Sequence, residues 1–148
     1  MKASPNNRVR GALLPLMLAP LAAAAFAGEL RLVEHSSAPV TIHLGQGSDN
    51  PGDLMQFENP VFDAANKIQV ATDHGFCIRV TPGKSWECLW TLTTKDGQIT
   101  VEGPYMDTGD SHFAVTGGTG KYAGARGSMM LHPRDTQSRN YDFVYELL

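Results

Sequence analysis

The sequence predicts an all-β fold, and three observations favour this class. Apolar and polar side chains alternate at period two along most of the chain, whereas the 3.6-residue period of an amphipathic helix is nowhere sustained. Gly, Pro, Asp and Asn separate the alternating segments, as turn residues do. About eight short strands with a single core are typical of an antiparallel sandwich or barrel.

The first 27 residues predict a secretion signal peptide. Lys2, Arg8 and Arg10 form a positive segment, a stretch rich in Leu and Ala follows, and Ala25-Phe26-Ala27 matches a cleavage site. Two prolines interrupt the apolar stretch, which is also short for a membrane span. We therefore expect an exported protein, periplasmic or extracellular, that begins at Gly28 and has no membrane span after cleavage.

The rest of the chain, residues 28–148, is expected to form one barrel or sandwich domain. Expected strands cover residues 29–32, 40–43, 68–71, 75–80, 85–93, 99–102, 111–115, 129–132 and 141–146. Two polar segments, 45–52 and 133–140, are expected to be loops. No internal repeat or linker indicates a second domain.

Two cysteines flank a predicted hairpin. Thr81-Pro-Gly-Lys84 is a turn signal, and folding the chain about Pro82-Gly83 places Cys77 directly opposite Cys88. Directly opposed residues of antiparallel strands lie near the distance that a disulfide spans. An oxidising compartment then favours a Cys77–Cys88 bridge over two free thiols.

Alternation also sorts the hairpin side chains into two faces, both of them substantially apolar. One face carries Cys77, Arg79, Trp86, Cys88 and Trp90, and the other carries Phe76, Ile78, Val80, Glu87 and Leu89. One face must line the core, and the other is suited to a subunit contact.

Charge argues against a nucleic-acid partner. Without the leader, nine Lys and Arg oppose fifteen Asp and Glu, which gives a net charge of −6, and the basic residues do not cluster. The five histidines lack the H-x-x-x-H or H-x-H spacing of metal ligands, and no G-x-S-x-G nucleophile motif is present. We expect no metal and no cofactor.

Four segments in order resemble the allene oxide cyclase and dirigent family of small β-barrels. They are Gly52-Asp-Leu54 with Phe57 and Asn59; Gly75-Phe-Cys77; Glu102-Gly-Pro-Tyr105; and Asp110–Gly118, continuing through Gly120 to Gly124-Ala-Arg-Gly127. The glycines of the last segment do not have the spacing of a Walker or dinucleotide loop. The resemblance implies an eight-stranded, antiparallel, up-and-down, calycin-like barrel that assembles as a homotrimer.

The resemblance also implies a ligand cavity and a set of site residues. Cys77 would point into the cavity, and Trp86 and Trp90 with it. Asn59 matches the family's water-holding Asn, although the sequence leaves open whether its amide instead bonds backbone next to Pro60. The remaining candidate catalytic residues are Tyr105, for which a place in the core or at the rim is the alternative, Pro39, and Glu34 or Glu29 as the first-strand glutamate, neither of which matches convincingly.

The expected function is therefore the binding of a small apolar or aromatic molecule in the barrel. As an enzyme, the protein would be a cofactor-independent isomerase or cyclase that acts mainly by positioning its substrate. The sequence leaves open a non-catalytic, dirigent-like orienting or carrier role, and a structural secreted barrel filled by its own side chains.

Overall fold

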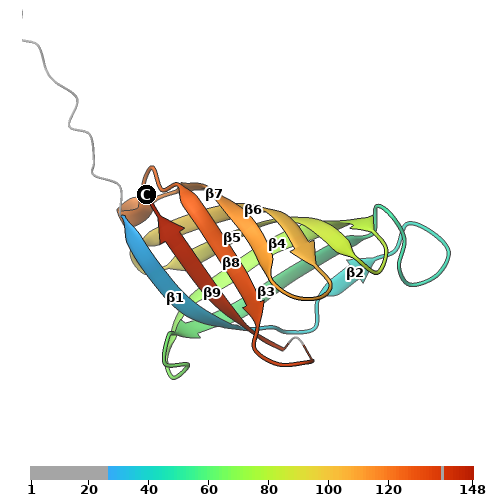
Figure 1. Cartoon of the computed structure of the whole chain (residues 1–148), viewed down its shortest axis with the longest axis horizontal. Helices are drawn as coiled ribbons and strands as arrows, with labels where there is room; N and C mark the ends of the chain where they lie inside the picture. Colours follow the sequence, from blue (N-terminus) through green and yellow to red (C-terminus); the bar gives the residue numbers. More distant parts are fainter. Residues whose placement is uncertain (1–26, 138) are drawn as a thin grey trace, which may run out of the picture.

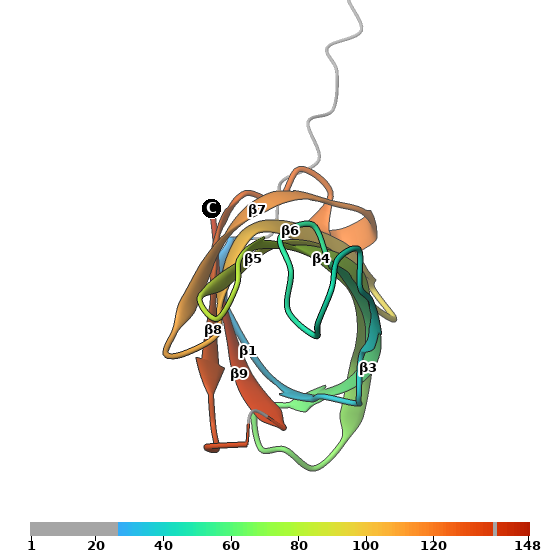
Figure 2. The ribbon, with the colours of Figure 1, turned by 90° about the vertical axis from the view of Figure 1, so that its right-hand side faces the viewer.

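The described part of the chain, residues 27–137 and 139–148 of a computed structural model, forms one closed antiparallel β-barrel (Figures 1 and 2). The elements are β1 (Gly28–His35), β2 (Val40–Ile42), β3 (Leu54–Asp63), β4 (Gln69–Thr81), β5 (Ser85–Thr94), β6 (Gly97–Met106), β7 (Ser111–Gly118), the 3-10 helix η1 (Gly120–Tyr122), β8 (Gly127–Pro133) and β9 (Asn140–Leu147). The signal-peptide prediction falls on residues outside the described range, Ala27 excepted. No helix in the described range is long and apolar enough to cross a membrane.

Neighbouring strands pair in the order β1-β9-β8-β7-β6-β5-β4-β3-β2, and β1 also pairs with β3. This second pairing, through Leu32–Glu34 and Val61–Asp63, closes an eight-stranded barrel. β2 continues the path of β1 along β3 after a break at residues 36–39, and it pairs with the first residues of β3. The predicted barrel is confirmed, with its first strand in two pieces.

Two strands differ from the sequence expectation. β3 was not expected as a strand, and the expected segments 68–71 and 75–80 fall, apart from Ile68, within the single 13-residue strand β4. Gly75 lies in the middle of β4, where an added Cβ atom would collide with Leu89 O and Trp90 Cβ of β5. Glycine is therefore needed because the backbone of β5 approaches too closely for a side chain.

The hairpin of β4 and β5 has the predicted register and faces. Cys77 pairs with Cys88, and Lys84 N donates to Thr81 O at 3.0 Å in the turn. The face that carries the cysteines and Trp90 is buried, whereas Phe76 and Ile78 on the other face are 43% and 45% exposed. The barrel interior is thus lined by the predicted face.

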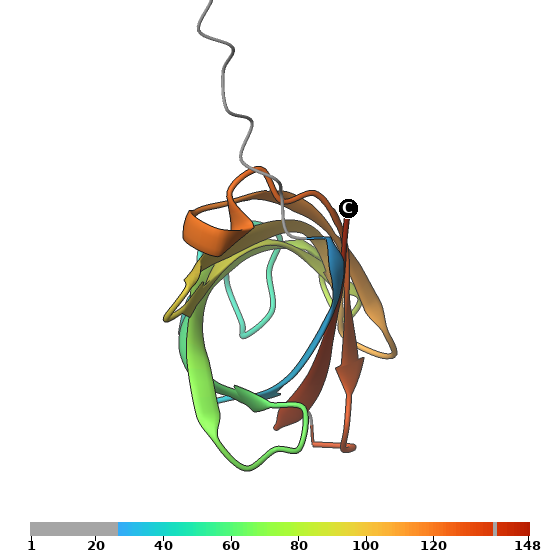
Figure 3. The same ribbon diagram turned by 90° about the vertical axis from the view of Figure 1, so that its left-hand side faces the viewer.

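The two ends of the barrel differ. At the end seen in Figure 3, which holds the β3–β4 turn and η1, the interior is filled with apolar side chains. Examples are Leu92, Ile99 and Met129, all 0% exposed. The glycine-rich segment turns tightly here, and a Cβ on Gly127 (φ +133°) would collide with Glu146 O. The open end seen in Figure 2 carries the loop between β2 and β3, which lies in front of the interior in that view.

Candidate functional site

A cavity of about 210 Å³ occupies the barrel interior on the side of the open end. Its wall is mainly apolar, with a few polar groups. The lining residues are Glu34, Ser36, Pro39, Met55, Phe57, Asn59, Asp73, Cys77, Cys88, Trp90, Tyr105, Leu131, Tyr141 and Phe143. An apolar cavity with a few polar anchors is the usual form of a small-molecule site.

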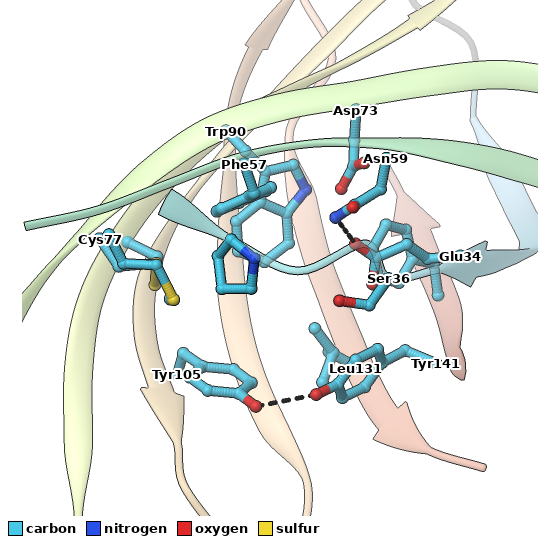
Figure 4. Close-up of a pocket in the computed structure, with 14 residues that line it drawn as sticks. Glu34, Ser36, Phe57, Asn59, Asp73, Cys77, Trp90, Tyr105, Leu131 and Tyr141 are labelled. Atoms are coloured by element: carbon cyan, nitrogen blue, oxygen red, sulfur yellow. Dashed lines mark hydrogen bonds between the residues drawn. A yellow bond between two sulfur atoms is a disulfide. The ribbon is translucent and has the colours of Figure 1, made fainter. Parts of the chain in front are cut away.

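Three buried polar side chains meet at the inner end of this cavity, which we call the floor: Glu34 of β1, Asn59 of β3 and Asp73 of β4. They are 5%, 3% and 0% exposed. Asn59 and Asp73 are direct cross-strand partners, and β1 pairs with β3 at Glu34. Three adjacent strands therefore project polar groups to one point of the interior (Figure 4).

Asn59 links Glu34 to the break between β1 and β2. Its side-chain nitrogen donates to Glu34 Oε1, and its side-chain oxygen accepts from the Ser37 backbone N–H at 2.7 Å. The amide thus holds both the carboxyl group and the backbone. The sequence-based alternative of a backbone bond is present here, across strands rather than next to Pro60, while the water-holding role stays a prediction.

Asp73 has no amide partner from a side chain. Its carboxyl group lies against the Glu34 carboxyl, with which it interacts as a hydrogen-bonding pair, and within the described range no hydrogen bond of regular geometry reaches its oxygens. Burial, and then repulsion by Glu34, raise the pKa of Asp73 far above its usual range, and burial raises the pKa of Glu34 by less. Two adjacent carboxyl groups in an apolar site do not both ionise readily, so the floor retains a proton at neutral pH.

A second pair of polar groups lines the cavity nearer the open end. Tyr105 of β6 and Tyr141 of β9 point their hydroxyl groups at each other at 2.9 Å (Figure 4). Burial and the Tyr141 hydroxyl raise the pKa of Tyr105, which keeps the phenol protonated. One hydroxyl donates to the other, so one O–H proton of the pair remains to donate elsewhere.

Aromatic rings form the cavity wall between the floor and the tyrosine pair. The indole of Trp90 lies 6.2 Å from the ring of Phe57 and 6.0 Å from the ring of Phe143, and it packs edge-on against Phe113 at 4.3 Å. Ring faces and edges of this kind contact a flat hydrocarbon or aromatic body well. The wall therefore favours a ligand with a flat apolar part.

The predicted disulfide is confirmed and forms part of the cavity wall. Cys77 and Cys88 are bonded across β4 and β5, with Cα atoms 4.0 Å apart, and no cysteine remains free. The bridge fixes the two strands next to Trp90, and it removes Cys77 as a thiol for chemistry.

Trp86 lies beyond the cavity. It is buried but does not line the cavity, and the Arg79 guanidinium stacks on its ring at 4.0 Å. Arg79 also binds Asp107 through Nη1 at 2.7 Å and Asp49 through Nε at 2.6 Å. Because Asp49 belongs to the β2–β3 loop, its ion pair with Arg79 holds this loop at the open end of the barrel.

The same loop is held from inside by Asp53, which is fully buried. Its carboxylate accepts from the backbone N–H of Leu44 at 2.8 Å and of Asn50 at 2.9 Å, and it lies 2.7 Å from His43 Nδ1. These contacts give the loop a fixed shape.

The structure brings most of the candidate residues together at the cavity, and it leaves two of them, Glu29 and Trp86, outside it. Glu34, Pro39, Asn59 and Tyr105 all line the cavity, as do Cys77 and Trp90. Glu29, the other candidate glutamate, is exposed and pairs with Arg31 at 2.6 Å, because it alternates with Leu30, Leu32 and Glu34, whose side chains face the interior.

The sequence analysis missed Asp73, together with Ser36 and Tyr141. A signal for Asp73 was present, since it lies four residues before Cys77 and so shares its face in a continuous strand. The polar segment around it was instead interpreted as the gap between two short strands.

The described residues contain no group of three or more His, Cys, Asp or Glu side chains that could hold a metal ion. Glu34 and Asp73 are the only carboxyl groups that line the cavity in this part of the chain. The chemistry that the site offers through its own side chains is therefore proton transfer, hydrogen bonding and positioning.

Solved structures share this barrel. A pyocyanin demethylase superposes with a TM-score of 0.71 at 23% identity, covering 82% of this chain and 100% of its own. A pterocarpan synthase dirigent protein gives 0.65 at 14% identity (81% and 92%), and a Diels–Alderase from Streptomyces koyangensis gives 0.66 at 18% identity (82% and 69%). At these identities the likeness shows a common fold.

The sequence profile of the allene oxide cyclase family matches residues 29–135, which include the four motifs and all of the barrel except its last strand. The chain belongs to the allene oxide cyclase family.

Proposed function

We propose that this protein binds a small apolar or aromatic molecule in its barrel and catalyses a cofactor-independent isomerisation or cyclisation of it. The observation that carries the proposal is the pair of buried carboxyl groups, Glu34 and Asp73, at the floor of an otherwise apolar cavity. Perturbed acid groups in a cleft are the usual mark of acid–base chemistry.

Stability alone does not account for this floor. Two carboxyl groups buried side by side in an apolar interior destabilise a fold, and a leucine of similar size would fill the position of Asp73 at no such cost. The interior also contains an open cavity, which a barrel with a purely structural role would be expected to fill. Both features favour a ligand site over a scaffold.

The structural neighbours support the same class of function. Their names describe a demethylase, a dirigent protein of pterocarpan synthesis and a Diels–Alderase, so this barrel hosts reactions of small organic molecules elsewhere. In such a cavity, the aromatic wall would orient the substrate while the floor supplies a proton donor and acceptor.

Export and assembly are parts of the proposal. The predicted leader and the Cys77–Cys88 bridge favour an exported protein. The exposed side chains of Val40, Phe76 and Ile78 lie on neighbouring strands and favour burial against further copies, as a homotrimer.

Ligand binding is tested with naphthalene as the first probe. In a Trp86→Phe background, Trp90 alone reports, and its emission should be quenched saturably because it lines the cavity. Leu131→Phe, which fills part of the cavity, should weaken binding about tenfold or more, whereas Met130→Phe, on the outer face of the same strand, should not.

Turnover is then sought with cyclic and aromatic substrates, comparing Glu34→Gln with the unchanged protein. Loss of turnover with binding retained supports the enzyme. Binding without turnover of any substrate would indicate the carrier or dirigent-like role. Absence of saturable binding by folded protein would contradict the proposal as a whole.

A further inference from the structure

The floor of the cavity holds a buried carboxylic acid, Asp73, whose neighbour is a second carboxyl group, that of Glu34. Asp73 is 0% exposed and lines the cavity, and neither of its oxygens has a hydrogen bond of regular geometry within the described range. Burial and the Glu34 carboxyl favour its neutral form, whose O–H is a donor. The same end contains Trp90 Nε1, a buried donor that lies against the Tyr145 hydroxyl.

Glu34, beside it, is the better placed to carry negative charge. Asn59 donates to its Oε1, which stabilises the carboxylate, and Asp73 has no comparable amide donor from a side chain. The carboxylate has a second oxygen that can accept a proton. An acid and a base thus lie next to each other at the floor of the cavity.

This arrangement defines the ligand atom that the floor can satisfy. A hydrocarbon offers no acceptor to Asp73, and a carboxylate would be repelled by the charge on Glu34. A carbonyl oxygen accepts from a carboxylic acid without bringing charge into the apolar cavity. The rings of Phe57, Trp90 and Phe143 would then contact the body of the molecule.

We infer that the substrate of the proposed reaction is a ketone on a flat apolar ring system, and that the floor interconverts its keto and enol forms. This inference rests on the proposed function. Asp73 donates its proton to the carbonyl oxygen while Glu34 removes a proton from the carbon next to the carbonyl.

The electron pair of the broken C–H bond becomes the C=C bond of the enol, and the π pair of the C=O bond is taken up in the new O–H bond. Return of a proton from Glu34 to carbon and of the enol proton to Asp73 restores both groups. If the proton returns to a different carbon of a conjugated ketone, the double bond has moved. No oxidant or reductant is consumed.

The test uses 2-tetralone and tetralin, which share a ring skeleton and differ in the carbonyl group. Binding is measured by Trp90 emission and by calorimetry, and exchange at the carbons next to the carbonyl is followed by NMR in D₂O. We expect 2-tetralone to bind about tenfold more tightly than tetralin. Exchange should exceed that of buffer by about a hundredfold.

Variants separate the two roles. Glu34→Gln should abolish catalysed exchange and keep the preference for the ketone. Asp73→Leu should lose both the preference for 2-tetralone over tetralin and the catalysed exchange. Asp73→Asn still has an amide that donates, so it should keep the preference for 2-tetralone and lose most of the catalysed exchange. Glu58→Gln, on the outer face beside Asn59, should change neither. If the leucine variant does not fold, the asparagine variant decides.

Equal binding of the two probes without exchange would overturn the inference and leave the proposed function standing, because the cavity would still bind an apolar ring. Failure of both probes to bind would contradict the proposed function itself. Exchange that persists unchanged in folded Glu34→Gln protein would overturn the assignment of the base.

Discussion

Replacing Asp73 by Asn should stabilise the barrel, and the gain should depend on pH. Asp73 is 0% exposed and faces Glu34, and Tyr145 is the other titratable group close to it. Its raised pKa means that the folded protein holds a proton that the unfolded chain releases. An asparagine has no proton to release, and its amide can donate to the Glu34 carboxylate.

The direction in which the stability changes with pH follows from this difference in bound protons. Below the unfolded pKa, about 4, Asp73 is protonated in both states and contributes its full stability. As the pH rises, the unfolded chain ionises first, so the stability of the unchanged protein falls until the raised pKa of the folded state is passed. The Asp73→Asn variant does not lose this contribution.

The magnitude follows from the burial. Each unit by which the pKa is raised corresponds to about 1.4 kcal/mol, so a rise of only two units gives about 3 kcal/mol at pH 8. For a domain of this size, that corresponds to about 10 °C in Tm. At pH 4 the two proteins should melt within about 2 °C of each other.

Thermal unfolding by circular dichroism from pH 4 to pH 9 measures the effect, with Glu58→Gln as the exposed control. The Tm difference between Asp73→Asn and the unchanged protein should widen as the pH rises, while the control follows the unchanged protein. Parallel curves for all three proteins would refute the assignment of a neutral Asp73.

Three further predictions concern the frame around the site. Protein with the Cys77–Cys88 bridge intact should show no alkylatable thiol, and reduction should lower the stability by about 3 kcal/mol in urea unfolding; two titratable thiols would contradict it. Arg79→Met should cost about 2 to 4 kcal/mol and expose the β2–β3 loop to protease, because it leaves Asp49 of that loop, and Asp107 with it, without the cation; an unchanged cleavage rate would show that the loop does not depend on this contact. Exported protein should begin at Gly28 by intact mass, and a mass that includes the leader would exclude cleavage.

Local pattern was sufficient for the parts of the fold that depend on one hairpin. The turn at Pro82-Gly83 sets the register, and the register alone places Cys77 opposite Cys88 and sorts the two faces. Which face lines the interior depended on the family resemblance, since both faces are apolar. The exposed Phe76 and Ile78 show why composition could not decide this point.

The strand β3 was missed because its alternation is weak. Pro60 and the preceding Asn59 resemble a break, yet a proline is tolerated here because Pro60 lies opposite the break between β1 and β2, where β3 has no paired strand on that side. The buried face of β3 is recognisable only when both neighbouring strands, β1 and β4, are in place.

The acid pair depends on closure of the barrel. Glu34 and Asp73 are 39 positions apart, and they meet because β1 pairs with β3 and β3 pairs with β4. The sequence offered both Glu29 and Glu34, and the spacing of Asp73 from Cys77 indicates a shared face only once one continuous strand joins them. Burial distinguishes Glu34 and Asp73 from the exposed Glu29, and burial is set only when the sheet closes into a barrel.

The central claim is that the floor of the cavity carries a neutral carboxylic acid at neutral pH. A ¹³C NMR titration of protein labelled at its Asp and Glu carboxyl carbons tests this most directly, with Asp73→Asn used to assign the signal. The account predicts one Asp resonance that remains in its protonated position at pH 7, that is absent from the variant, and that shifts when 2-tetralone binds. Complete ionisation of every Asp and Glu below pH 6 would contradict it.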